Sequence, residues 1–154
     1  MLMGSPYVKT KNKRIEVILS YANLKPKQRF IDLGCGDGIV VRYAVQKYKV
    51  YGTGIDINPL LIYRAKIMAV LQKLKGIKFR KENIFKADIK KADVIYLFLL
   101  PKLLVKLKDK FQKESKKNAL IISHGFEIEG WKKYQIKKIK DKPFSTYYYR
   151  LHSS

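Results

Sequence analysis

Residues 30–38, Phe-Ile-Asp-Leu-Gly-Cys-Gly-Asp-Gly, constrain the possible fold more than any other stretch of the sequence. They read as a short apolar strand running into a glycine-rich turn, and residues 39–48 then carry a helix-compatible pattern. A strand, tight turn and helix start together make a ligand site, because glycines let backbone N–H groups approach a ligand and the helix N-terminus favours its negative end. Dinucleotide sites require G-x-G-x-x-G. The glycines here, Gly34, Gly36 and Gly38, have a different spacing, G-x-G-x-G.

A second strand points to the same ligand site. Residues 51–57, Tyr-Gly-Thr-Gly-Ile-Asp-Ile, place Asp56 at a strand end about 20 residues after the turn, where an acidic residue can hold ribose hydroxyls. Taken singly, the two pieces could be a structural turn and a helix-capping Asp, but their joint spacing argues against that. With Asp32 before the glycines, the turn resembles motif I of class I S-adenosylmethionine (SAM) methyltransferases. The resemblance implies SAM as the cofactor.

The expected cofactor contacts lie at the carboxyl ends of strands, because ligands of open α/β sheets bind where the strand order switches. That switch is expected between the first and fourth strands. The predicted contacts are Asp32, Gly34 and Gly36 for the methionine part, Asp56 for the ribose, and Ile57, Asn83 and Ile84 for the adenine.

Hydrophobic periodicity predicts an α/β fold. Strands are expected at 29–33, 50–55, 77–81, 94–100 and 119–123, and helices at 13–23, 39–48, 58–74 and 101–114. The tail, 134–140 and 145–151, reads as an antiparallel hairpin. Together these give a doubly wound, mixed seven-stranded sheet, Rossmann-like as in class I SAM methyltransferases. The length of 154 residues predicts one domain, 1–154, with an N-terminal motif and helix in 1–24 and a core in 25–154.

The net charge of +22 is far from ordinary. Such a charge draws a protein toward nucleic acid or another anionic surface in a salt-sensitive way. Most of the charge is lysine, whereas arginine is the residue suited to bidentate phosphate contacts. The lysines are also spread over the whole chain, so a compositional bias is an equal alternative to a specific anionic partner.

Cysteine and histidine usage predicts a cytoplasmic protein without a metal site. Cys35 is the one cysteine and cannot form an internal disulfide, and its place in the turn suits a small packing residue better than a nucleophile. The two histidines, His124 and His152, have no paired cysteines. We expect no secretory signal peptide and no transmembrane segment, since the longest apolar run, 92–100, is well short of the ~20 residues that span a bilayer. The oligomeric state cannot be predicted.

The residues after the fourth strand bear on the methyl acceptor. Methyltransferases that act on base amino groups usually have Asp or Asn there, followed by Pro-Pro and an aromatic residue. This chain has Phe98-Leu99-Leu100-Pro101, and it has no Pro-Cys pair of the kind used in cytosine-C5 chemistry. Both differences argue against a nucleic-acid base as the acceptor.

Four motifs resemble the small archaeal protein-lysine methyltransferases, which are similar in turn to the mitochondrial enzyme that methylates a lysine of the ATP synthase c-subunit. They are Pro6-Tyr7-Val8-x-Thr10, the turn from Asp32 to Gly38, Phe98-Leu99-Leu100, and Ser123-His124-x-Phe126-Glu127-Ile128-x-Gly130-Trp131. The resemblance implies transfer of a methyl group from SAM to the side-chain amine of lysine in protein substrates. It further implies Thr10 and Phe98 as cofactor contacts, a substrate pocket of Tyr7, Phe98, Leu99, Ser123 and Trp131, and His124 and Glu127 as catalytic candidates.

Several alternatives stay open. His124 in a strand exit could be a hydrogen-bonded structural residue instead of a base, and Glu127 is expected to be a buried carboxylate. Phe126, Ile128 and Trp131 could simply pack. The chain departs from the family pattern at three places: Lys9 replaces the second proline of the N-terminal motif, Ile39-Val40 replace the usual arginine after motif I, and Gly125 replaces an acidic residue often found after the His. An RNA or DNA methyltransferase, favoured by charge, and a catalytically inactive SAM- or nucleic-acid-binding module are the alternative functions.

Overall fold

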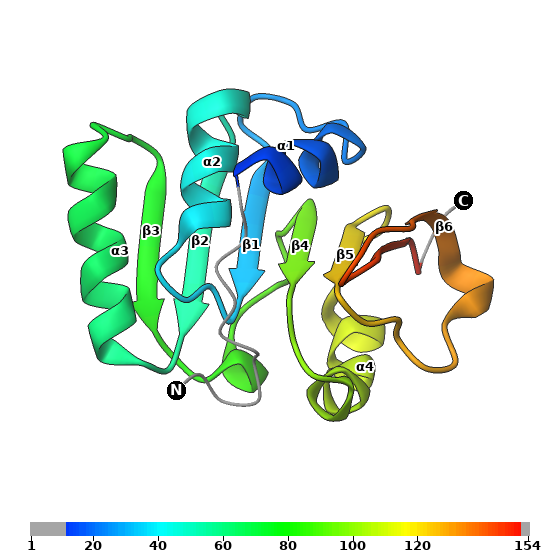
Figure 1. The fold of residues 1–154 in the computed structure, drawn as a ribbon. Coiled ribbons are helices and arrows are strands. Elements are labelled where there is room, and N and C mark those ends of the chain that lie inside the picture. The colour runs from blue at the N-terminus through cyan, green and yellow to red at the C-terminus, as the bar shows by residue number, and fades with distance from the viewer. Residues whose placement is uncertain (1–11, 152–154) are drawn as a thin grey trace.

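A computed structural model describes residues 12–151 of the chain. Its centre is one seven-stranded sheet with the order β3-β2-β1-β4-β5-β7-β6 (Figure 1). The strands are β1 Arg29–Leu33, β2 Tyr51–Asp56, β3 Ile77–Lys81, β4 Val94–Leu97, β5 Leu120–His124, β6 Gln135–Ile139 and β7 Thr146–Tyr149. The first five are parallel, and β7 pairs antiparallel with both β5 and β6. The mixed, doubly wound sheet and the C-terminal hairpin are therefore confirmed.

Helices cover both faces of the sheet. They are α1 Asn12–Ser20, α2 Ile39–Tyr48, α3 Pro59–Leu71 and α4 Pro101–Glu114, with the 3-10 helices η1 Ile84–Lys86 and η2 Lys132–Tyr134. One core cluster contains the inward residues of α1, α2 and α3, and the other contains those of α4 and η1. Apolar residues recur in α4 at Leu103, Leu104, Leu107 and Phe111, and all four are buried. This spacing of three to four residues is what lets one helix face pack on the sheet.

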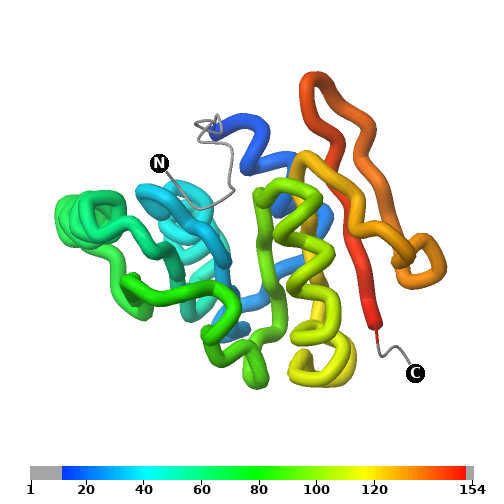
Figure 2. The backbone as a smooth tube through the Cα atoms, turned by 90° about the horizontal axis from the view of Figure 1, so that it is seen from below, coloured from blue at the N-terminus to red at the C-terminus, as the bar shows by residue number. Residues whose placement is uncertain are grey.

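The switch in strand order lies between β1 and β4, as expected. From β1 the chain continues outward to β2 and β3, and it then returns to place β4 on the other side of β1 (Figure 1). Every residue of β4 is buried, because parallel neighbours flank it and helices cover both of its faces. Figure 2 views the carboxyl ends of the parallel strands, with α3 at one end of the molecule and the β6–β7 hairpin at the other.

Local signals set most boundaries. The Asn58 side chain accepts hydrogen bonds from Leu60 N (3.0 Å) and Leu61 N (3.3 Å), and Pro59 is the first residue of α3. The predicted strand 94–100 is shorter in the structure because the chain leaves the sheet after Leu97 to enter α4 at Pro101. The predicted helices 13–23 and 58–74 end earlier, at Ser20 and Leu71. Within residues 12–151, no helix combines the length and apolar character that crossing a bilayer requires.

Candidate active site

The glycine turn is fastened to the end of β2 by backbone hydrogen bonds. Gly34 N and Cys35 N both donate to Ile55 O, at 2.7 and 2.9 Å. Gly38 has φ +78°, and a Cβ at this position would lie 2.4 Å from Cε1 of Phe79. Only glycine combines this left-handed backbone with so close an approach. The turn therefore has a fixed position at the carboxyl edge of the sheet, where a ligand is expected.

Asp56 joins the end of β2 to the same turn. Its carboxylate accepts hydrogen bonds from Gly36 N and Asn58 N, each at 2.9 Å. Burial raises the pKa of the Asp56 carboxyl, and the N–H groups of Asn58, Gly36 and Ile57 oppose this effect. The carboxylate is thus held at the turn by backbone donors, at the position from which the sequence predicts ribose binding.

Three buried carboxylates surround the turn. Burial raises the pKa of Asp32 well above its ordinary value, and the charges of Asp56 and Asp37 raise it further. Asp37 also accepts a hydrogen bond from Ile39 N at 3.3 Å, at the start of α2. The ionised forms of these carboxylates are therefore destabilised by burial and mutual repulsion, and a cationic ligand group would relieve that repulsion.

Arg42 is a site residue that the sequence reasoning missed. Its Nε donates to Asp37 O (3.4 Å), and one guanidinium nitrogen lies 3.9 Å from Asp37 Oδ1. The other nitrogen donates to Gln72 Oε1 at 3.0 Å. Arg42 thus holds the turn from α2 and is itself held by the end of α3. The sequence signal is an arginine directly after the apolar run of residues 39–41, and the structure shows that this arginine is buried.

The chemistry of these residues fits SAM. The carboxylates of Asp32 and Asp56 suit the ammonium, the sulfonium and the ribose hydroxyls, and the exposed Ile57 offers an apolar surface. Asn83 uses its side-chain oxygen to accept from Phe85 N (2.9 Å), which caps η1. Ile84 is buried in the core, so its side chain does not open to this edge.

An aromatic cluster lies at the ends of β4 and β5. We use the name aromatic cluster for Phe98, His124, Phe126 and Phe144. The ring centroids of Phe98 lie 4.8 Å from His124 and 5.2 Å from Phe144, and those of Phe126 and Phe144 are 5.8 Å apart. A Cβ at Gly125 would come within 2.8 Å of Phe98, so the family's acidic residue at this position has no room here. Phe144 comes from the hairpin and was missed, because it belongs to no local motif.

His124 is buried and uncharged. Its Nδ1 lies 2.8 Å from Oγ1 of Thr146, a residue of β7. Burial, and next the charge of Arg14, lower the pKa of His124 to about 4, while Asp141 acts in the opposite direction. At neutral pH the ring is therefore neutral, and the structure favours the hydrogen-bonded alternative over the base.

Two further predicted residues join the cluster to the turn. Ser123 is fully buried and donates through Oγ to Phe126 O at 2.6 Å, which fixes the loop after β5. Leu99 is also buried, and its Cδ2 lies 3.0 Å from the position of a Cβ on Gly34. The aromatic cluster and the glycine turn are thus in reach of one another through Leu99.

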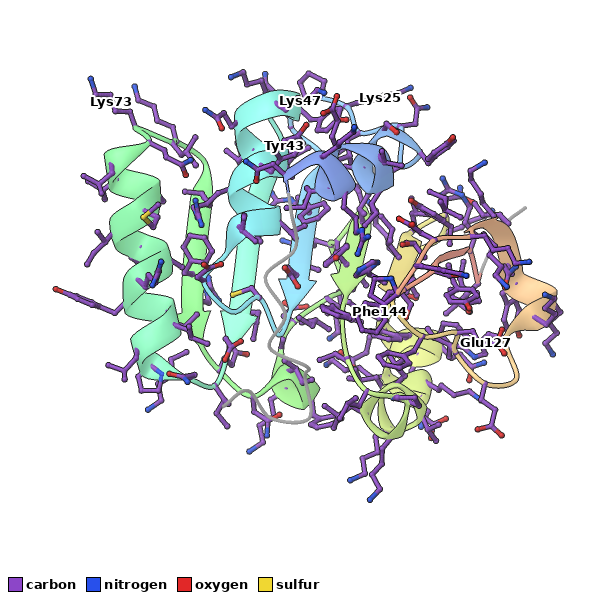
Figure 3. The ribbon with its side chains drawn as sticks, viewed as in Figure 1. Lys25, Tyr43, Lys47, Lys73, Glu127 and Phe144 are labelled. Carbon is purple, nitrogen blue, oxygen red and sulfur yellow. The ribbon has the colours of Figure 1, made fainter. Side chains whose placement is uncertain are left out.

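Two side chains lie away from the aromatic cluster. Trp131 is 1% exposed and packs against Phe111, Tyr134 and Tyr149 at ring distances of 6.1, 5.9 and 5.7 Å, so the structure shows it as a core residue and its part in a substrate pocket stays a prediction. Glu127 is exposed and not buried. In Figure 3 it lies out on the loop after β5, whereas Phe144 lies near the ends of β4 and β5. Tyr7 and Thr10 lie outside the described residues.

The fold and the site together define a class I SAM-dependent methyltransferase. The switch point between β1 and β4, the glycine turn and the carboxylate at the end of β2 are the features that define it. A family model, the ANTKMT methyltransferase domain, matches residues 32–135, and the chain belongs to this family.

Three relatives illustrate the similarity. The chain is 36% identical over 141 residues to a protein-lysine N-methyltransferase of Saccharolobus islandicus (strain REY15A), a match that covers 88% of this chain and 86% of the relative. It is 28% identical to the adenine nucleotide translocase lysine N-methyltransferase of Mus musculus, covering 82% of this chain and 55% of that protein. The crystal structure of an RNA methyltransferase from Salinibacter ruber with S-adenosyl-L-homocysteine superposes with TM-score 0.90, at 27% identity and 94% coverage of both chains.

Proposed function

We propose that the protein transfers the methyl group of SAM to the side-chain amine of lysine in protein substrates. The observation that carries the proposal is the aromatic cluster beside the glycine turn, in which a neutral His124 contacts Phe98 and Phe144. The names of the Saccharolobus and mouse relatives support the same acceptor.

A lysine must lose a proton before it can react. Its ammonium form has no lone pair and an ordinary pKa near 10.4. The rings of Phe98, Phe126 and Phe144 offer an apolar surface to its stem and would favour the neutral amine by desolvation. Bound SAM supplies an electrophilic methyl group on a sulfonium, whose positive charge disfavours an ammonium nearby.

The protein needs to position the amine more than to activate it. Holding two reactants in line can supply ~7–11 kcal/mol in favourable intramolecular cases. His124 has a pKa of about 4, so it is a poor match for a proton donor such as lysine, and we assign it a positioning role through Thr146. The rate should then rise toward alkaline pH in wild type and in His124→Ala alike. A bell-shaped profile whose acid limb disappears in His124→Ala would make His124 the base.

Glu127 needs a separate test because it is exposed. An exposed carboxylate can attract a lysine-bearing protein without accepting its proton. Glu127→Gln should therefore raise KM and leave kcat and its pH profile unchanged. A fall in kcat at unchanged KM would assign Glu127 to proton transfer.

An RNA methyltransferase is the second candidate. The Salinibacter structure, which carries that name, and the net charge of +22 favour it, whereas Phe98 in place of Asp or Asn argues against a base amino group as the acceptor. Labelled SAM incubated with a cell extract separates the two candidates: label on lysine survives nuclease and is lost with protease. Label that disappears with ribonuclease would favour RNA.

Cofactor binding tests the common assumption behind both candidates. Calorimetry with SAM or S-adenosylhomocysteine should give measurable heat with the folded protein. A catalytically inactive module would bind SAM and transfer no label to either polymer, and the absence of heat would overturn the whole assignment. The single domain, the cytoplasmic location and any weak, salt-dependent binding of nucleic acid stay predictions.

A further inference from the structure

The outer face of α3 carries an apolar stripe. Within residues 12–151 it is formed by Leu60, Tyr63, Ile67, Val70 and Leu71, whose exposed fractions range from 41% to 78%. Their spacing of three to four residues places them along one side of the helix. The opposite side of α3 buries Ile62, Ala65 and Ala69 against the sheet. α3 is therefore apolar on both faces, although only one face packs within the protein.

Such a stripe requires an explanation. Single exposed apolar residues are ordinary, whereas a contiguous apolar patch marks a surface that meets another molecule or a membrane. The stripe lies at one end of the molecule, because α3 packs on β3, the edge strand of the sheet (Figures 1 and 2). It is thus free to meet a large flat partner.

The charge around the stripe has one sign. Residues 58–81, which contain α3 and β3, include seven Lys or Arg and no Asp or Glu. All seven are exposed: Arg64, Lys66, Lys73, Lys75, Lys78, Arg80 and Lys81. In Figure 3, Lys73 extends outward beyond the end of α3. An anionic surface complements this segment.

A groove runs between α3 and β3 beside the stripe. It has a volume of about 440 Å³ and combines apolar and basic lining residues. The apolar side is formed by Val70, Leu74 and Ile77, and the basic side by Lys66, Lys78 and Arg80. This arrangement suits an amphiphile, which has an apolar chain and an anionic head.

We propose that the α3–β3 face docks on an anionic lipid bilayer, with the stripe at the boundary between headgroups and acyl chains and the basic residues at the lipid phosphates. An amphipathic surface with basic flanks binds membranes in this way. A second copy of the chain is disfavoured because each copy carries +22 and residues 58–81 have no acidic group to pair. Nucleic acid would match the basic residues and leave the leucines and valine without a partner.

Vesicle co-sedimentation tests the proposal. The full chain is mixed with vesicles of phosphatidylglycerol and phosphatidylcholine in equal parts, or of phosphatidylcholine alone. We expect binding to the anionic vesicles that weakens as salt rises and is at least tenfold weaker with phosphatidylcholine. Absence of binding to the anionic vesicles at low salt would overturn the proposal.

Matched variants separate the stripe from the general charge. Leu60→Gln, Val70→Gln and Leu71→Gln combined keep the net charge and use a good helix former. We expect this triple variant to lose at least tenfold in vesicle affinity with unchanged circular dichroism. Val105→Gln with Ile136→Gln is the control, since these exposed apolar residues lie on other elements, and it should bind as wild type does. Equal loss in both variants, or none in the triple variant, would overturn the proposal. So would a dimer, detected by sedimentation velocity, that the triple variant abolishes, because the stripe would then serve a second copy.

Discussion

The charge state of His124 predicts a specific loss of stability in acid. Burial first, and Arg14 next, lower the pKa of this buried ring to about 4 in the folded protein. In the unfolded chain the same ring has its ordinary pKa near 6.5. Between these two values the unfolded chain binds more protons than the folded protein does, so stability must fall as the pH falls.

The size of the effect follows from the two pKa values. Each tenfold difference in proton affinity is worth about 1.4 kcal/mol, so the loss between pH 7 and pH 4 is about 3 kcal/mol. It begins near pH 6.5, where the unfolded ring takes up a proton. It levels off below pH 4, where the folded ring is protonated too.

Denaturant unfolding at a series of pH values measures this loss. Carboxylates titrate in the same range, so the useful quantity is the difference between wild type and His124→Gln. The variant should be less stable at pH 7, since it loses packing against Phe98, and the difference should shrink by about 3 kcal/mol by pH 4. A difference between wild type and His124→Gln that stays constant from pH 7 to pH 4 would refute the buried neutral histidine.

Three further variants test the site and the turn. Asp32→Asn should stabilise the SAM-free protein at neutral pH, because the raised pKa of Asp32 means that its charged form opposes folding. Thermal unfolding without SAM should show the higher stability and calorimetry with SAM the weaker binding, and a loss of SAM-free stability would contradict the reasoning. Asp56→Asn should cost about 1–3 kcal/mol of SAM binding in calorimetry, and unchanged affinity would remove Asp56 from the site. Gly38→Ala should destabilise the protein by about 1 kcal/mol through its left-handed backbone and by about 1–3 kcal/mol more through the clash with Phe79. Gly130 has a similar φ of +81° but no such ring beside it, so Gly130→Ala should lose only the backbone contribution of about 1 kcal/mol on denaturant unfolding. Equal losses in the two glycine variants would show that the Phe79 contact is unimportant.

The sequence predicted those parts of the fold that depend on local signals. The ranges 29–33, 39–48, 77–81 and 101–114 agree with β1, α2, β3 and α4 because a glycine or proline lies at or near one end of each element and the apolar pattern gives its length. The position of β7 between β5 and β6 could not be predicted. A hairpin can join a sheet edge by either of its strands, and long-range packing decides which.

In the candidate site too, local motifs could be predicted from the sequence and long-range contacts could not. The glycine turn and Asp56 were recognisable because their residues follow one another at fixed spacing. The aromatic cluster was only half visible, since Phe98 and His124 stand in motifs while Phe144 reaches them through the hairpin. No local pattern around Phe144 distinguishes it from any other aromatic residue of the tail.

Trp131 and Asp32 show which sequence signals can mislead and which can be used. An aromatic residue such as Trp131 fits a pocket or a core equally well, and its burial is decided by Phe111 and Tyr149, which are remote in sequence. A carboxylate inside an apolar strand fits a ligand site but not a core, because its burial opposes folding unless a positive group compensates. Natural sequences break such a local rule chiefly where function requires it. The buried Asp32, held beside Asp56 and Asp37, is therefore stronger evidence for a cationic ligand than any aromatic residue is for a substrate pocket.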